Sequence, residues 1–336
     1  MEYVTIQGLP QKICRIGIGT WAIGGWLWGG TDEKVAIEAL HHAFDLGINL
    51  VDTAPVYGFG LSEEIVGKAI KSYSGNKENL VVATKVGLDW HNENVFRDSR
   101  KERIIQEIED SLRRLQRESV DLYQVHWPDF ETPFEETAHS LYKLLHAGKI
   151  RAIGLSNYTP EMIEEFKKIA PVHTLQSPFN LFERAMEVAE LPYCKKNQIV
   201  FLGYGPLCRG LLSGRMNKHT TFKGDDLRKL DPKFREPYFS RYLDCTTRLE
   251  AWAAAKHTHS LLELALRWCL DKGIDIPLVG VRHSQQLDFF QKVWGWKLTS
   301  QDLQEIDDIL LETLKEPIGP EFMAPKARKD ILQRAL

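Results

Sequence analysis

The chain has 336 residues, of which 43% are hydrophobic and 26% are charged. This balance is typical of a globular protein and excludes the fibrous and intrinsically disordered classes. The formal net charge at pH 7 is only −3, so the composition indicates neither a nucleic-acid partner nor binding to an anionic membrane surface. A chain of this length can bury a large core without disulfide or metal cross-links.

The spacing of the cysteines and the composition of the N-terminal segment indicate the cellular compartment. The five cysteines are far apart in the sequence, and no pair has the spacing of metal ligands, so neither a disulfide framework nor a zinc site is expected. The N-terminal segment MEYVTIQGLPQK has no apolar signal core, and no apolar run approaches about 18 residues. We therefore expect a cytoplasmic protein with no membrane partner. The oligomeric state is not determined, and a monomer is compatible with the sequence.

The first predicted element is a small hairpin within residues 1–15. One pattern then repeats: an amphipathic helix, a glycine, and a short apolar strand that ends in polar residues, as in VAIEALHHAFDLGINLVDTA and LYKLLHAGKIRAIGLSNY. These two helices are expected to end at Gly47 and Gly148, because glycine adopts the left-handed conformation without strain. Ser99 and Glu102 predict a capping box before the helix that contains IEDSLRRL.

Continuously apolar strands are typical of parallel strands buried on both faces. The predicted strands end near Thr20, Asp52, Lys85, His126, Ser156, Gln176, Tyr204 and Gly280. Eight strands alternating with helices predict an α/β fold, the (β/α)8 or TIM barrel, which typically takes about 250 residues. A doubly wound sheet is the competing fold, but GIGTWAIGG after the first strand is not the GxGxxG turn that such folds use.

Residues beyond a minimal barrel are expected in two further places. A long polar loop follows the seventh strand over about 205–256, and extra helices form a C-terminal tail over about 299–336. We interpret these parts and the hairpin as additions to a single barrel domain that spans residues 1–336.

Four ionisable residues fall at the end of the predicted barrel where such barrels carry their chemistry. Asp52, Lys85 and His126 end strands, and Tyr57 lies in a loop between them. Each residue alone also has a purely structural explanation. Asp52 could cap a backbone segment, Lys85 could extend to solvent, Tyr57 could be an ordinary loop aromatic, and His126 could be a core histidine. Together they predict acid catalysis. The ammonium is expected to lower the pKa of the phenol from its ordinary value of about 10, and the carboxylate to hold the ammonium in place. Tyr57 would then protonate a carbonyl oxygen while hydride reaches the carbon.

The sequence resembles the aldo-keto reductase superfamily, and within it the bacterial NADPH-dependent reductases of the general-stress type. The resemblance covers essentially the whole chain, in GTWAIGG, DTAPVYGFGLSEEIVGKAI, ATKVGLDW, DLYQVHWPD, GKIRAIGLSNY, YGPLCRGLLSG and GVRHSQQL. It implies the TIM-barrel fold and the reduction of carbonyl compounds by NADPH. The family's catalytic tetrad corresponds to Asp52, Tyr57, Lys85 and His126, in which tyrosine donates the proton and histidine orients the substrate.

The resemblance also implies an NADP site at this end of the barrel. The nicotinamide end would be held by Thr20, Trp21, Asp52, Ser156, Asn157, Gln176 and Tyr204, with Tyr204 stacked on the ring. The pyrophosphate would lie on the loop of Gly205, Pro206, Leu207, Arg209 and Gly210, whose glycines allow backbone N–H groups to approach phosphate. Gly280 and Gln286 would lie at the adenosine end.

Three arginines are expected to contact phosphates of this cofactor. Arg282 matches the family position that binds the 2′-phosphate, which favours NADP over NAD. Arg215 and Arg228 lie on the long loop, and a solvent-exposed side chain is the alternative for Arg228. Ser284 is expected to cap a helix whose N-terminus attracts phosphate. Phe290 stands where many relatives have an asparagine that contacts adenine.

The substrate cleft is expected to have aromatic walls, as small-molecule sites often do. Trp21, Trp28, Trp90 and Trp127 are predicted to form them, whereas Trp26 is expected to seal the top of the barrel. Such walls suit small-molecule aldehydes with aliphatic or aromatic bodies, and the resemblance adds oxo-aldehydes and aldoses. No specific substrate follows.

Two other functions stay open at this point. An NADP-binding accessory or redox-sensing subunit with little turnover is one, because some relatives on this fold assemble on membrane channels. A Schiff-base lyase that uses Lys85 is the other, although Asp52 should keep that amine protonated. His257 and His259 lack a third ligand nearby in the sequence, so no metal site is predicted.

Overall fold

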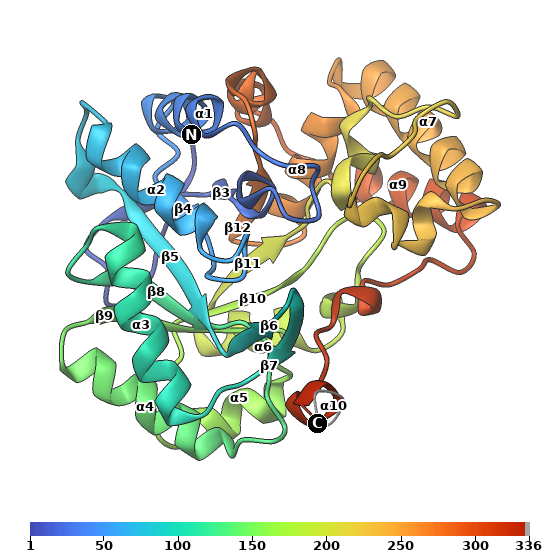
Figure 1. The fold of residues 1–336 in the computed structure, drawn as a ribbon. Helices are drawn as coiled ribbons and strands as arrows, with labels where there is room; N and C mark the ends of the chain where they lie inside the picture. Colours follow the sequence, from blue (N-terminus) through green and yellow to red (C-terminus); the bar gives the residue numbers. More distant parts are fainter. Residues whose placement is uncertain (333–336) are drawn as a thin grey trace.

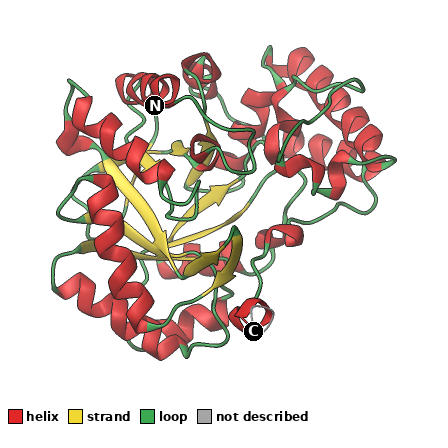
Figure 2. Cartoon of the chain, in the orientation of Figure 1, coloured by secondary structure: helices red, strands yellow, loops and turns green. Residues whose placement is uncertain are grey.

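The computed structural model describes residues 1–332, and eight parallel strands in it close into a barrel surrounded by helices (Figures 1 and 2). In order around the barrel they are β3 (Gly17–Gly19), β4 (Leu50–Asp52), β5 (Val81–Val86), β8 (Val120–Val125), β9 (Ile150–Ser156), β10 (Thr174–Pro178), β11 (Val200–Tyr204) and β12 (Ile276–Gly280). Leu278 of β12 pairs with Gly17 of β3 and closes the ring. The predicted TIM barrel is confirmed, and each strand ends within two residues of its predicted end.

The helices of the repeating units pack outside the strands. They are α1 (Glu33–Asp45), α2 (Leu61–Ser72), α3 (Lys101–Leu115), α4 (Phe134–His146), α5 (Pro160–Lys167), α6 (Glu190–Asn197) and α8 (Leu261–Asp271). Gly47 and Gly148 follow the C-cap residues of α1 and α4 and have the predicted left-handed conformation, with φ angles of 88° and 71°. None of the helices in residues 1–332 is long and apolar enough to cross a membrane.

The capping box predicted before α3 is wrong. The helix begins at Lys101, and its N-cap is Arg100, whose own side chain makes no capping hydrogen bond. The carboxylate of Glu136 instead accepts the backbone N–H of Lys101 at 2.9 Å. Ser99 instead lies buried before the helix, and its backbone N–H donates to the carboxylate of Asp129 at 3.0 Å. This tertiary bond holds the serine one position too early for the capping geometry.

The core has two layers. One lies between the strands and the helices, and the other fills the barrel interior with inward side chains such as Leu50, Leu122 and Leu202. The N-terminal hairpin, β1 (Tyr3–Thr5) and β2 (Lys12–Cys14), belongs to the inner layer, because its segment contributes Ile6, Leu9 and Ile13. The hairpin therefore closes the end of the barrel opposite to the carboxyl ends of the strands.

Three additions surround those carboxyl ends. A second hairpin, β6 (Leu88–His91) and β7 (Asn94–Arg97), follows β5 and was not predicted. The segment after β11 is not a loop throughout, because it continues into the 20-residue helix α7 (Tyr238–His257). After α9 (Ser300–Thr313) the tail runs past the mouth to α10 (Arg328–Leu332), beside the β6–β7 hairpin (Figure 1). Residues 333–336 of the predicted tail lie outside the described residues.

Asn49 joins the N-terminal hairpin to the barrel. Its side chain is buried, accepts the backbone N–H of Cys14 at 2.9 Å, and donates to the carbonyls of Lys12 and Asn79 at 3.0 Å each. These contacts satisfy backbone groups of three segments at once, so the stability of the hairpin closure depends on this one amide.

We expect Asn49→Ala to lower the free energy of unfolding by about 2–3 kcal/mol, because it leaves one buried donor and two carbonyls without partners. Thermal and urea denaturation would measure the loss. Asn94→Ala, at an exposed position of β7, should change stability by less than about 0.5 kcal/mol. Equal effects of the two substitutions would contradict this account.

Candidate active site

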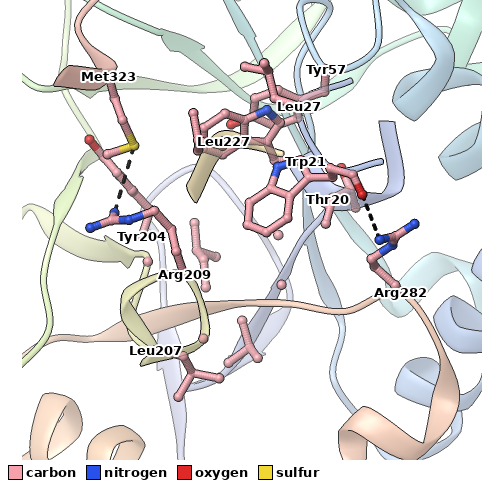
Figure 3. A pocket seen from close by; sticks show the side chains of 18 of the residues that line it. Thr20, Trp21, Leu27, Tyr57, Tyr204, Leu207, Arg209, Leu227, Arg282 and Met323 are labelled. Carbon is pink, nitrogen blue, oxygen red and sulfur yellow. Dashed lines mark hydrogen bonds between the residues drawn. The ribbon is translucent and has the colours of Figure 1, made fainter. Parts of the chain in front are cut away.

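A cavity of about 850 Å³ opens at the carboxyl ends of the barrel strands, within the size range of small-molecule sites. All the residues predicted to hold the cofactor line it: Thr20, Trp21, Asp52, Ser156, Asn157, Gln176, Tyr204, Gly205, Pro206, Leu207, Arg209, Gly210, Arg215, Arg228, Gly280, Arg282 and Gln286. In Figure 3, Trp21 lies beside Tyr57, and Arg209 and Arg282 stand on opposite sides of the cavity.

The tetrad residues come together at the floor of this cavity. Lys85, at the end of β5, is fully buried and forms a salt bridge with Asp52, at the end of β4. Its ammonium also donates to the carbonyl of Thr53 at 2.9 Å and to the hydroxyl of Tyr57 at 3.2 Å. These three bonds use all three N–H donors of the ammonium. Tyr57 and His126 face the cavity above the buried pair.

The pKa of Tyr57 differs from the expectation. Burial, and next the nearby charge of Asp52, raise this pKa well above the ordinary value of a phenol. The predicted lowering by Lys85 is therefore wrong for this state, because removal of the hydroxyl from water outweighs the ammonium. The consequence is that Tyr57 holds its proton firmly. The lysine still lies at hydrogen-bond distance, where it can stabilise negative charge as that charge forms on the phenolic oxygen.

Burial, and next the ammonium of Lys85, lower the pKa of His126 well below its ordinary range. The imidazole is therefore neutral at neutral pH and can donate one hydrogen bond into the cavity. Its ring packs edge-on against Tyr57 with the ring centroids 5.7 Å apart. Burial also lowers the pKa of Lys85, and the carboxylate of Asp52 acts against this lowering.

The second oxygen of Asp52 is bonded by two amides. Gln176 and Gln124 each donate to Oδ2 at 2.9 Å. Gln124 was not among the residues predicted for the site. The sequence pattern could have indicated it. Residues at i and i+2 point to the same side of a strand, so a glutamine two residues before His126 in an apolar strand is expected on the same side as His126.

The nicotinamide end of the predicted cofactor site is a connected set of polar groups. Tyr204 donates its hydroxyl to Oδ1 of Asn157 at 3.0 Å, and Nδ2 of Asn157 donates to the carbonyl of His126 and to Oγ of Ser156, each at 3.0 Å. Asn157 adopts a left-handed conformation, with φ of 63°, which asparagine tolerates better than most residues. The set is suited to an amide-bearing ring.

The other end of the cavity is suited to phosphates. Within residues 1–332, and apart from the glycine and its chain neighbours, no atom lies within 4 Å of the position that a Cβ would take at Gly205 or Gly280, so both backbones are open to a ligand. The guanidinium of Arg282 donates only to the carbonyls of Trp28 and Gly30 among the residues described. No carboxylate there forms a salt bridge with it, although its charge helps to lower the pKa of nearby Asp226. These residues fit a dinucleotide phosphate.

Two residues at this end form polar contacts with other residues of the protein. Arg209 bonds to Glu183 and Asp231 and is 9% exposed, so its charge is already compensated. Oε1 of Gln286 accepts the backbone N–H of Arg282 at 2.7 Å.

Cys208 lies next to Arg209 in the sequence. Burial raises the pKa of its thiol to about 12, which favours a packing role over redox chemistry.

Near the adenosine end, one prediction is wrong, and the structure shows where Phe290 lies. Ser284 caps no helix. It is the first residue of a 3-10 helix of four residues whose N-cap is His283. Phe290 does not line the cavity but is fully buried in the core beside Trp294. Its replacement of asparagine is therefore a packing feature.

Three of the four tryptophans that were predicted to form the substrate walls lie in the cavity lining. Trp21, Trp28 and Trp127 line the cavity, but Trp90 does not. The β6–β7 hairpin places Trp90 against Phe59 and the guanidinium of Arg103. Trp26, predicted only to seal the barrel, lines the cavity.

The aldo/keto reductase family model matches residues 15–311. The chain belongs to this family. It is 52% identical to aldo-keto reductase YhdN of Bacillus subtilis over 98% of this chain and 100% of that protein. It is 36% identical to an NADH-specific methylglyoxal reductase of Escherichia coli over 80% of this chain and 86% of that protein.

Solved structures agree with this assignment. The glycerol dehydrogenase AKR11B4 of Gluconobacter oxydans superposes with a TM-score of 0.87 at 49% identity, covering 96% of this chain and 99% of that one. The holo form of AKR11C1 from Bacillus halodurans gives 0.76 at 27% identity, covering 92% and 96%. This aldo-keto reductase is thus an oxidoreductase of carbonyl compounds, and its family binds nicotinamide cofactors.

The pKa directions predict the pH profile of carbonyl reduction. His126 stays neutral as the pH falls through about 6.5, the ordinary histidine value, and Tyr57 keeps its proton up to about pH 10. We expect kcat/KM to be flat from about pH 6 to about pH 9. His126→Gln removes the ionisable ring and should give a slower profile of the same shape. An inflection near pH 6.5 that only the unsubstituted protein shows would contradict the assignment.

Proposed function

We propose that this protein reduces aldehydes to alcohols with NADPH, with Tyr57 as the general acid. The observation that carries the proposal is the contact of Lys85 with both Asp52 and the hydroxyl of Tyr57 beneath a cavity. The other end of this cavity carries Arg282, which forms no salt bridge among the described residues. A buried acid, a group that stabilises its conjugate base and a phosphate-binding end are what such a reduction requires.

Each tetrad residue has a distinct role in the proposed reaction. A nicotinamide cofactor, when bound in this cavity, would supply hydride to the carbonyl carbon. Tyr57 delivers its proton to the carbonyl oxygen, and the ammonium of Lys85, 3.2 Å away, stabilises the phenolate that forms. Asp52 keeps the ammonium charged and in place. Neutral His126 orients the carbonyl oxygen by donating a hydrogen bond.

Lys85 is poorly suited to Schiff-base chemistry. Its three N–H donors are all used by Asp52, Thr53 and Tyr57, and its side chain is fully buried. An amine that acts as a nucleophile needs a free lone pair and access to the carbonyl carbon. The lyase alternative is therefore disfavoured.

The preference for NADPH is argued from this chain, because the family includes both an NADH-specific reductase and an NADP-named one. Arg282 lines the cavity and bonds only to backbone carbonyls among the described residues. Asp32 also lines the cavity, but its carboxylate accepts the N–H of Val35 and caps α1. A 2′-phosphate would meet a guanidinium here.

The segment over about 205–256 is proposed to cover the bound cofactor. Both oxygens of Asp225 accept backbone N–H groups of the loop after β3, from Leu27 at 2.7 Å and Gly29 at 3.1 Å. The N–H of Leu227 donates to the carbonyl of Leu27 at 2.9 Å. These contacts hold the segment over one side of the cavity.

The substrate end is largely apolar. Trp21 stacks on Tyr57 with ring centroids 6.0 Å apart, and Trp127, Leu88 and Phe322 also line the cavity. Such a surface suits aldehydes with aliphatic or aromatic bodies. Small oxo-aldehydes and aldoses are further candidates, since similar proteins are named a methylglyoxal reductase and a glycerol dehydrogenase.

We expect Tyr57→Phe to lower kcat for benzaldehyde and glyceraldehyde by about 10²–10⁴-fold, because the general acid is lost. Loss of NADPH absorbance measures the rate, and quenching of tryptophan fluorescence measures the Kd for NADPH, which should change less than about threefold. Tight NADPH binding without turnover in the unsubstituted protein would contradict the proposal and favour the accessory-subunit alternative.

Arg282→Ala should raise the Kd for NADPH by about 10–100-fold, the effect of losing charge-assisted bonds to a phosphate. The Kd for NADH should stay within about threefold, because that cofactor lacks the phosphate. Arg113→Ala, an exposed arginine of α3, is the control and should alter neither value. Equal weakening of NADPH and NADH would show that Arg282 acts on the shape of the site rather than on the 2′-phosphate.

A further inference from the structure

We propose that Gln124 is a positioning residue that makes the Gln176 amide present only its oxygen to the cavity, and thereby selects a cofactor ring bearing a carboxamide N–H₂ group. The inference rests on the proposed function in that it takes Gln176 to lie at the nicotinamide. Gln124 itself is fully buried in β8 and does not line the cavity. It acts through Gln176 of β10, which does.

The hydrogen bonds of Gln176 account for both of its N–H donors. Its Nε2 donates to Oδ2 of Asp52 at 2.9 Å and to Oε1 of Gln124 at 3.0 Å. A primary amide nitrogen has two N–H groups, so none is left for a ligand. Oε1 of Gln176 accepts no hydrogen bond from the residues described. The side chain therefore meets the cavity as an acceptor.

Gln124 is oriented by the same carboxylate. Its Nε2 donates to Oδ2 of Asp52 at 2.9 Å, which places its Oε1 toward Gln176. Turning either amide over would bring an amide oxygen against the carboxylate, which is buried and paired with Lys85. Asp52 thus orients Gln124, and the two together orient Gln176.

Gly154 makes this arrangement sterically feasible. Gln124, Gly154 and Thr174 are register partners on β8, β9 and β10, so the Gln124 side chain must pass over β9 to reach Gln176. A Cβ at residue 154 would stand 2.7 Å from Cγ of Gln124 and 2.4 Å from Oγ1 of Thr174. Only a glycine leaves room for the crossing.

An acceptor-only surface discriminates between two pyridine rings of nearly equal shape. The carboxamide of NADP⁺ can donate an N–H to Oε1 of Gln176, whereas the acetyl group of 3-acetylpyridine adenine dinucleotide phosphate presents a methyl group there. Without Gln124, one N–H of Gln176 loses its partner and can turn to the cavity, where it can serve the carbonyl that both rings carry. The selectivity between the two cofactors should then fall.

The test is the ratio of the two dissociation constants, measured without substrate by tryptophan fluorescence or calorimetry. We expect the full chain to bind NADP⁺ about tenfold or more tightly than the acetylpyridine analogue, the effect of an unmade hydrogen bond. Gln124→Leu should reduce this ratio to below about threefold. Thr174→Val is the matched control, because Thr174 is equally buried on the same strand as Gln176 and its hydroxyl has no partner among the described residues. Its ratio should equal that of the unsubstituted protein.

Three results would overturn the inference: a Gln124→Leu ratio equal to that of the unsubstituted protein, a Thr174→Val ratio that falls equally, or no selectivity in the unsubstituted protein. The last needs no variant, so the inference stays testable if Gln124→Leu fails to fold. Failure of the unsubstituted protein to bind NADP⁺ at all would instead refute the proposed function.

Discussion

The site depends on one buried ion pair, between Lys85 and Asp52. Two charges taken out of water are costly, and their attraction compensates only if the remaining hydrogen-bonding groups also find partners. Here the ammonium is completed by the carbonyl of Thr53 and the hydroxyl of Tyr57, and the carboxylate by the amides of Gln124 and Gln176. Two of the residues that offset the cost of burial thus also have proposed functions: Tyr57 is the proposed acid, and Gln176 is a proposed cofactor contact.

The same constraint explains the pKa of the tyrosine. A site dry enough to strengthen the interaction between Lys85 and a developing phenolate also makes the resting phenol harder to ionise. Burial thus keeps the proton on Tyr57, as the proposed role of this residue as a general acid requires. His126 is kept neutral by the same desolvation together with Lys85.

A second buried charge cluster holds the walls of the cavity together. Glu183 binds both Arg209, in the turn after β11, and Lys233, farther along the same segment, and Asp231 also pairs with Arg209. Lys233 in turn donates to the carbonyl of Gly319 at 3.0 Å, which fixes the tail near the mouth. These buried ion pairs and the hydrogen bond to Gly319 therefore connect parts of the chain that are distant in sequence.

The barrel and the tetrad could be predicted from the sequence because both depend on local pattern. Apolar runs that end in Asp52, Lys85 and His126 mark the strand ends, and in a parallel barrel those ends must meet at one face whatever else the chain does. The positions proposed to hold the cofactor followed from family resemblance, and all of them line the cavity.

Other features of the site were decided only by the tertiary structure, because they depend on contacts across the barrel and between segments distant in sequence. The pKa of Tyr57 depends on how much water the assembled walls exclude. Trp90 packs against Phe59 and does not line the cavity, because it lies in the β6–β7 hairpin. Ser99 donates its backbone N–H to Asp129 and does not cap α3. Gln124 reaches Gln176 only because Gly154, on the strand between them, has no side chain. Periodicity determines on which side of a strand a residue lies, but its partner is determined by the strands beside it.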